Sequence, residues 1–218
     1  AVQVQILVPI VKDIVSQELA KHSQVASPVA VDKVNLLEEK VQKLELINAA
    51  QSTQLTEMGE IIEDLQNKVD DLEQYGRRMS LRFSGIPEGK NENTDELVLK
   101  TVNEKMGVKI DINDIQRSHR TGRPGRSKPR QILARFGSYR TRARVYAAKR
   151  ALKNTEIFIS EDLTKWRNQL FYQARLLKKN QKIEDTYTRD GRIIVKYKDP
   201  AGKTSTMEVR SESELNDF

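Results

Sequence analysis

The stretch Ile115–Thr155, IQRSHRTGRPGRSKPRQILARFGSYRTRARVYAAKRALKNT, decides both the fold and the charge of this 218-residue chain. It holds 13 Lys or Arg residues and no Asp or Glu. A field of one sign destabilises a compact chain unless a polyanion compensates it, whereas an ordinary solvated surface mixes both signs. The stretch is also patterned, because PRQILARF alternates like a strand and SYRTRARVYAAKRALK has helical spacing. We therefore expect an ordered basic surface that binds nucleic acid.

The segments on either side of this stretch complete a small mixed domain. RRMSLRFSGIPEG (77–89) alternates like a strand, and the acidic pair after Thr94 favours a helix that is capped there and runs to Met106. IDINDIQRSHR and PRQILARF predict two more strands joined by a basic loop, Ser138 starts a second helix, and IFIS is a fourth strand. This order is that of a ferredoxin-like RNA-recognition motif. We assign the domain to residues 76–162 of an α+β chain.

The open face of the predicted sheet lacks the aromatic residues that usually stack on RNA bases. Gln131 and Leu133 stand where two of them are expected on the third strand, and Arg82 stands where one is expected on the first. Arg82 and Arg135 share the open face by alternation, and a guanidinium can stack on a base or pair with a phosphate. We therefore expect mostly electrostatic binding with weak sequence preference.

A heptad repeat precedes this domain and predicts a coiled coil over residues 34–75. With Val34 at position a, ten of the twelve seam positions are apolar over six heptads, and the other faces are largely charged. Two polar seam residues, Asn48 and Gln51, fix the register or bind an ion at the axis. The seam consists of Val34, Leu37, Val41, Leu44, Asn48, Gln51, Leu55, Met58, Ile62, Leu65, Val69 and Leu72.

The residues that flank the seam bear on the number of strands. KVNLLE, KVQKLE and KVDDLE each place Lys before an apolar a position and Glu after an apolar d position, and the last frame runs from Lys68 to Glu73. This resembles the Arg-containing pattern of three-stranded coiled coils, with Lys in place of Arg. β-Branched residues at a with Leu at d would alone favour a dimer. We predict a parallel homotrimer and keep the dimer as the alternative.

The two ends of the chain carry weaker patterns. Residues 1–33 predict a short amphipathic helix and a linker, SQVASPVAV, in which Pro28 breaks the helical pattern. Residues 163–218 predict a second small domain: a helix capped by Thr164, three strands with an Asp190-Gly191 turn, and an acidic terminal helix. Tyr187 and Tyr197 on these strands could stack on bases, although packing is favoured.

Composition excludes several classes of function. Cys is absent, which excludes disulfides, Cys-based zinc sites and a thiol nucleophile. Residues 1–74 hold 6 basic and 13 acidic residues, a net charge of −7, and the other 144 hold 32 and 18, a net charge of +14. No apolar run reaches the length of a membrane span. Glu161 and Asp162 could bind a metal, but we expect them to cap the following helix. We expect no catalysis and no cofactor, because no nucleotide-binding or nucleophile motif occurs.

The local segments resemble a known family. INDIQRSHR, PRQILARF, IFISEDLTKWR and LLKKN occur in the order found in the first-open-reading-frame protein of LINE-one-type retrotransposons, over Val34–Phe218. The resemblance implies a homotrimer that binds single-stranded RNA, and also DNA, and acts as a nucleic-acid chaperone. Such a protein coats its transcript in cytoplasmic ribonucleoprotein particles, with a nuclear location left open, and supports RNA-mediated transposition. Lys in place of Arg in the trimer pattern and a different coil length depart from the family.

The resemblance and the charge pattern together assign candidate RNA-binding residues. The resemblance assigns Arg78, Arg82, Arg117, Arg135, Arg150, Arg167 and Arg175. The charge pattern adds Arg120, Arg123, Arg126, Lys128, Arg130, Lys149, Lys178 and Lys179. We expect a continuous cleft between the two small domains, walled by Arg82, Arg135, Arg167 and Arg175, and a basic loop that acts as a mobile clamp. The alternative function is a coiled-coil scaffold whose basic domains bind a protein or an acidic membrane.

Overall fold

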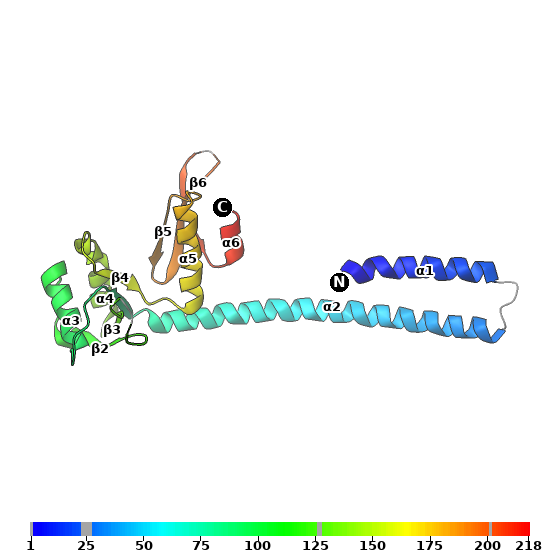
Figure 1. Ribbon diagram of the computed structural model, residues 1–218, viewed down its shortest axis with the longest axis horizontal. Coiled ribbons are helices and arrows are strands. Elements are labelled where there is room, and N and C mark those ends of the chain that lie inside the picture. The colour runs from blue at the N-terminus through cyan, green and yellow to red at the C-terminus, as the bar shows by residue number, and fades with distance from the viewer. Residues whose placement is uncertain (1, 23–27, 126–127, 201) are drawn as a thin grey trace. The chain divides into compact units, whose positions relative to one another are not determined.

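The computed structural model describes residues 2–22, 28–125, 128–200 and 202–218, with side chains from residue 9 onward except 19, 21, 22 and 28–30. It divides into two compact units, residues 1–64 and 65–218. The chain is mixed α+β, with a long N-terminal helix followed by antiparallel sheets (Figure 1).

The N-terminal part contains two helices, α1 (Val2–His22) and α2 (Pro28–Arg77). The prediction that Pro28 lies in a linker is wrong, because it is the first residue of α2. Proline suits that position, where the N–H that it lacks would have no helical partner. At its other end α2 continues through Gly76 to Arg77, two residues beyond the predicted end of the coiled coil.

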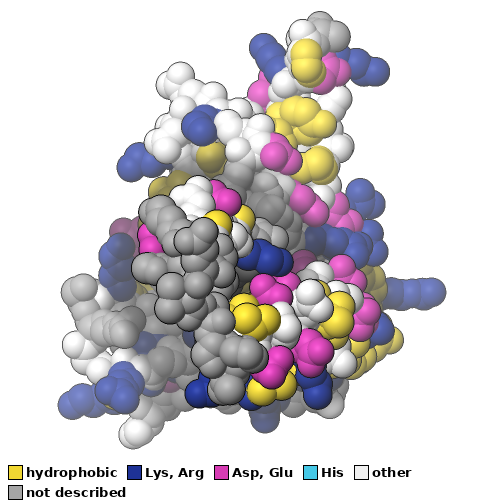
Figure 2. Space-filling view, turned by 90° about the vertical axis from the view of Figure 1, so that its right-hand side faces the viewer, with side chains coloured by type: hydrophobic (Ala, Val, Ile, Leu, Met, Phe, Trp, Pro, Cys, Tyr) yellow, Lys and Arg dark blue, Asp and Glu magenta, His cyan; other side chains and the backbone are white. Residues whose placement is uncertain are grey.

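A stripe of exposed apolar side chains runs along most of α2. From Leu37 to Leu72 the nine apolar seam side chains are 46–73% exposed in the single chain. Leu36, Leu46 and Ile61 are also exposed although they lie off the seam, so the apolar surface is wider than the heptad pattern predicts. Figure 2 shows hydrophobic side chains at the surface among acidic and basic ones.

The first sheet is antiparallel and has the strand order β2-β3-β1-β4. Alternation places Leu81, Phe83 and Ala134 on its buried face, where Val98 and Val145 from the helices complete the core. The sequence order strand–helix–strand–strand–helix–strand is the one predicted. Its elements are β1 (Ser80–Ser84), α3 (Thr94–Lys100), a π-helical turn (Thr101–Lys105), a 3-10 turn (Ile112–Asp114), β2 (Ile115–Arg120), β3 (Ile132–Phe136), α4 (Tyr139–Ala147), a 3-10 turn (Ala148–Leu152) and β4 (Phe158–Glu161).

The helix caps of this sheet's helices were partly predicted. Ser138 caps α4 by accepting the N–H of Thr141 (3.0 Å), as expected. The cap of α3 is Asn93 rather than Thr94, because the amide oxygen of Asn93 accepts the backbone N–H of Asp95 (3.1 Å). Thr94 instead lies inside the first turn.

The second sheet is a meander in the order β5-β6-β7, covered on one face by α5 (Figure 1). Thr164 caps α5 by accepting the N–H of Arg167 (3.1 Å), as predicted. Leu170 and Ala174 of α5 pack against Ile193 of the sheet. The elements are α5 (Lys165–Lys179), β5 (Asp185–Arg189), β6 (Arg192–Lys198), β7 (Thr204–Val209) and α6 (Glu212–Asn216).

The turn between β5 and β6 connects the second sheet to the rest of its unit. Asp190 and Gly191 both have positive φ, 52° and 77°, as a tight hairpin turn requires. Asp190 accepts a hydrogen bond from the hydroxyl of Tyr139 in α4 (2.5 Å), and this bond raises the pKa of Tyr139. The backbone N–H of Gly191 donates to Glu161 at the end of β4 (3.1 Å). The turn therefore lies against both α4 and β4.

Candidate nucleic-acid interface

Three arginines share the open face of the first sheet. Arg82 of β1 lies between the buried Leu81 and Phe83, so its side chain lies on the opposite face. Strand pairing places Arg135 of β3 opposite Ser80 and Arg117 of β2 opposite Arg135. The structure thus places Arg82 and Arg135 on one face, as the sequence predicted, and adds Arg117 beside them.

Two hollows lie along this face. A hollow of about 410 Å³ is lined by Arg82 and by Lys165 and Arg175 of α5, and one of about 250 Å³ by Arg117 and Arg135. Arg77 lines both hollows, and Asp162 lines the smaller one. We name these six basic residues the open-face site: Arg77, Arg82, Arg117, Arg135, Lys165 and Arg175.

A buried carboxylate holds two of these arginines in place. Asp162, whose side chain is 4% exposed, accepts from Nε of Arg82 (2.7 Å) and from Nη1 of Arg77 (3.1 Å). Burial opposes the charge of Arg77, but hydrogen bonds to Glu73 and Asp162 outweigh it and raise the pKa of Arg77. The three groups Arg77, Arg82 and Asp162 together carry one net positive charge in fixed positions.

Arg135 is also held by short contacts. Its Nε donates to the side chain of Gln116 (2.8 Å), and its Nη1 donates to the carbonyl oxygen of Gly76 (3.1 Å). The side chain remains exposed to solvent. An arginine that is both exposed and fixed loses little conformational freedom when it binds a phosphate.

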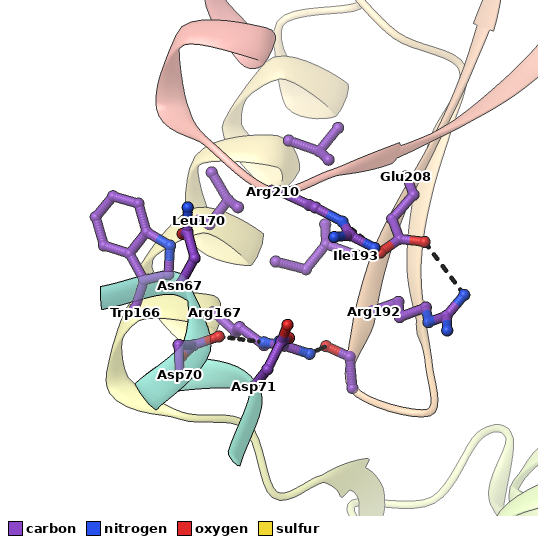
Figure 3. Close-up of a pocket in the computed structure, with 12 residues that line it drawn as sticks. Asn67, Asp70, Asp71, Trp166, Arg167, Leu170, Arg192, Ile193, Glu208 and Arg210 are labelled. Carbon is purple, nitrogen blue, oxygen red and sulfur yellow. Dashed lines mark hydrogen bonds and ion pairs between the residues drawn. The ribbon is translucent and has the colours of Figure 1, made fainter. Parts of the chain in front are cut away.

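Arg167 does not lie in the open-face site. The predicted cleft of four arginines is therefore wrong for Arg167. Its Nε donates to Asp70 of α2 (2.6 Å), its Nη1 to the carbonyl oxygen of Gly191 (3.2 Å), and it forms an ion pair with Asp71 (Figure 3). Residues 167 and 175 are eight positions apart, which turns their side chains about 80° from each other around α5. Arg175 borders the open face, and Arg167 contacts the end of α2.

Arg120 is a structural residue rather than a member of the site. Its side chain is 4% exposed and donates to Glu92 (2.8 Å) and to the carbonyl oxygens of Ile86 (2.8 Å) and Arg130 (2.6 Å). The hydrogen bond from Arg120 lowers the pKa of Glu92 to about 2. Alternation along β2 puts Arg120 on the face opposite to its neighbour His119.

Four other predicted residues have partners outside the open face. Arg130 donates to Glu88 (3.0 Å), and this hydrogen bond lowers the pKa of Glu88. The guanidinium of Arg78 lies over the ring of Tyr75. The remaining two are Lys149, over the ring of Tyr146 (3.7 Å), and Lys178, paired with Asp185 (2.5 Å), which lowers the pKa of Asp185.

The rest of the predicted set is exposed and lies away from the two hollows. Exposed residues are Arg123, Lys128, Arg150 and Lys179. Arg126 lies outside the described residues, so the loop clamp stays a prediction. The sequence analysis missed Arg77 and Lys165, which lie at a helix end and a helix start. The only feature of the sequence that could have revealed Arg77 and Lys165 is that each directly adjoins a predicted element of the site.

Two acidic residues near the site pair with arginines. Glu161 accepts from the buried Arg142 (2.5 Å) and Asp162 from Arg77 and Arg82, so the prediction that they cap α5 is wrong. Within the described ranges no group of three or more His, Cys, Asp or Glu is arranged to hold a metal ion. The helices described there include none long and apolar enough to cross a membrane.

No protein-family model matches the chain.

Proposed function

We propose that this protein binds single-stranded RNA through the open-face site and assembles as a homotrimer through α2. The observation that carries the proposal is the open-face site itself, in which six basic side chains from α2, the first sheet and α5 border two adjoining hollows. The sheet order β2-β3-β1-β4 supports a ferredoxin-like, RNA-recognition-motif assignment. The resemblance to LINE-one-type proteins extends the proposal to a nucleic-acid chaperone that coats retrotransposon RNA in cytoplasmic ribonucleoprotein particles and supports RNA-mediated transposition.

The apolar surface of α2 supports self-association. Nine seam side chains at 46–73% exposure form an apolar stripe that only Asn48 and Gln51 interrupt, and exposed apolar patches of this kind mark protein–protein interaction surfaces. Knobs-into-holes packing of a second and third copy would cover it. The Lys–Glu frames, of which Lys68 and Glu73 form the last, favour three strands over two. A parallel trimer would carry three open-face sites on one RNA and raise affinity through effective concentration.

The site favours phosphate contacts over reading of base sequence. Arg77, Arg82 and Arg135 are held by internal hydrogen bonds, so they can meet the backbone of an unpaired strand at low entropic cost. Phosphate contacts carry no sequence information directly. Binding should therefore be tolerant of sequence, as coating a long transcript requires.

The decisive experiment measures equilibrium binding of the full chain to a fluorescent single-stranded RNA as a function of salt. We expect a linear fall of log affinity with log salt, with a slope of about −0.7 for each phosphate contact. Anionic lipid vesicles and an acidic polypeptide of equal charge serve as competitors. If either displaces the RNA at equal charge concentration, the alternative scaffold function is favoured. If the chain shows no RNA binding at low salt, the proposal is refuted.

A further inference from the structure

The edge strand of the first sheet carries an exposed phenylalanine on the open face. Phe158 begins β4 and is 66% exposed, whereas Ile159 and Glu161 of the same strand are buried. Alternation therefore places Phe158 and Ser160 on the open face together. Strand pairing sets Phe158 opposite Ser84 and Ser160 opposite Arg82.

The groups beside this ring can form hydrogen bonds and carry positive charge. Nε2 of Gln131 donates to the hydroxyl of Ser84 (2.9 Å), and Nη1 of Arg82 donates to Oε1 of Gln131 (3.4 Å). Arg82, Gln131 and Ser160 line the 410 Å³ hollow, whose other wall carries Lys165 and Arg175. An exposed ring thus lies at the edge of a strip of polar groups that ends in cations.

This arrangement is chemically complementary to one nucleotide. A nucleobase has a flat face that stacks on an aromatic ring and an edge that accepts and donates hydrogen bonds, and its phosphate pairs with a guanidinium. A single exposed apolar residue on a polar surface needs no explanation by itself. At Phe158, however, the ring shares its face with the amide of Gln131 and the guanidinium of Arg82.

We propose that Phe158 is a base-stacking residue of the RNA site, which rests on the proposed RNA-binding function. One base stacks on the ring of Phe158, its edge lies near Gln131 and Ser84, and the adjoining phosphates lie toward Arg82 and Arg175. The expectation that the sheet holds no stacking aromatic considered only the positions on β1 and β3. The ring on β4 supplies stacking from the edge strand, and stacking tolerates any base because every base has a π-face.

The test compares two ligands of equal charge. Binding of the full chain is measured at one fixed salt to a single-stranded RNA and to an abasic oligonucleotide with the same number of phosphates. The variants are Phe158→Ala, Phe158→Leu and Phe158→Tyr, and the control is Ile112→Ala, which removes an exposed apolar side chain from the 3-10 turn before β2. Thermal unfolding of each variant verifies that the fold is retained.

We expect Phe158→Ala and Phe158→Leu to weaken binding to the base-bearing strand about 5- to 150-fold and to leave abasic binding unchanged. Phe158→Tyr and Ile112→Ala should match the wild type on both ligands. Equal affinity of Phe158→Ala and wild type for the base-bearing strand overturns the stacking role and leaves the proposed function intact. An equal loss on both ligands also overturns it, because the ring then acts without a base. Failure of the wild type to bind either ligand removes the proposed function itself.

Discussion

Replacing Gly191 with alanine should weaken the packing of the β5–β6 turn against the end of α2. A Cβ added to Gly191 would lie 2.6 Å from Cγ and 2.7 Å from Cδ of Gln74. Gln74 is 5% exposed, and both ends of its amide are engaged: Oε1 accepts the N–H of Thr164 (3.0 Å), and Nε2 donates to the carbonyl oxygen of Asp162 (3.0 Å). The side chain cannot move away from the methyl group without losing both hydrogen bonds.

The expected loss in the free energy of unfolding of Gly191→Ala has two separable contributions. Gly191 has a φ of +77°, and an alanine in that conformation costs about 1–2 kcal/mol. The overlap with a fixed side chain adds about 1–3 kcal/mol, as for an overpacked core. Gly191→Ala should therefore lower the free energy of unfolding by about 2–5 kcal/mol. Gly202 is a matched control, because it has a φ of +78° and no atom within 4 Å of the added Cβ. Gly202→Ala should cost only the first contribution.

The assay is urea unfolding of the full chain at one fixed protein concentration, since self-association would make stability depend on concentration. A second background tests the cause: in Gln74→Ala the cost of Gly191→Ala should fall to that of Gly202→Ala, which is a coupling that a double-mutant cycle measures directly. Equal costs for Gly191→Ala and Gly202→Ala in the wild-type background would refute the docking of this turn on Gln74.

Three further predictions address assembly, RNA binding and pH. Changing Val69 and Leu72 to Asp should convert three chains to one in sedimentation equilibrium, because charges would be buried at the seam; a variant that stays trimeric contradicts the α2 interface. Arg82→Ala should weaken RNA binding by about 1–3 kcal/mol at fixed salt, whereas Arg120→Ala should mainly lower thermal stability; the reverse pattern would assign Arg120 to the site. The lowered pKa of Glu92 gives stability that is complete above its ordinary pKa of 4.5 and lost as pH falls toward 2, so Glu92→Gln should flatten acid unfolding over that window by about 1–2 kcal/mol; parallel pH curves would argue against the Arg120–Glu92 pair.

Local patterns in the sequence predicted the elements that depend on near neighbours. Leu81 and Phe83 mark the buried face of β1 because a strand alternates, and Ser138 and Thr164 cap their helices because a side-chain oxygen can reach an N–H three residues on. The Asp190-Gly191 pair predicted the hairpin turn because both positions need positive φ. The start of α2 was misplaced because Pro28 was taken as a helix breaker, although a first helical residue needs no donor.

The site was harder to predict because its members are set by partners far along the chain. Arg167 is held by Asp70, which is 97 residues earlier, and charge spacing along α5 cannot reveal that pair. Arg120 lies in the most basic stretch, yet a register shift between Ile115 and Arg117 decides which side of β2 faces the open surface. Basic charge located the surface, and tertiary contacts decided which of its arginines lie on the open face.

Asp162 lowers the net positive charge of the open-face site but fixes the positions of two of its arginines. Its carboxylate removes one positive charge from the open-face site, yet it fixes Arg77 and Arg82, which come from different elements, in neighbouring positions. Without it the two guanidiniums would repel each other, Arg77 would keep only Glu73 and Arg82 only Gln131 as partners, and a phosphate would have to do more of the ordering. The backbone carbonyl oxygen of Asp162 also accepts a hydrogen bond from Nε2 of Gln74, in the last turns of α2 (3.0 Å). The last turns of the helix that we propose to trimerise are therefore hydrogen-bonded to the residue that positions two arginines of the open-face site, so a change at either is expected to affect both.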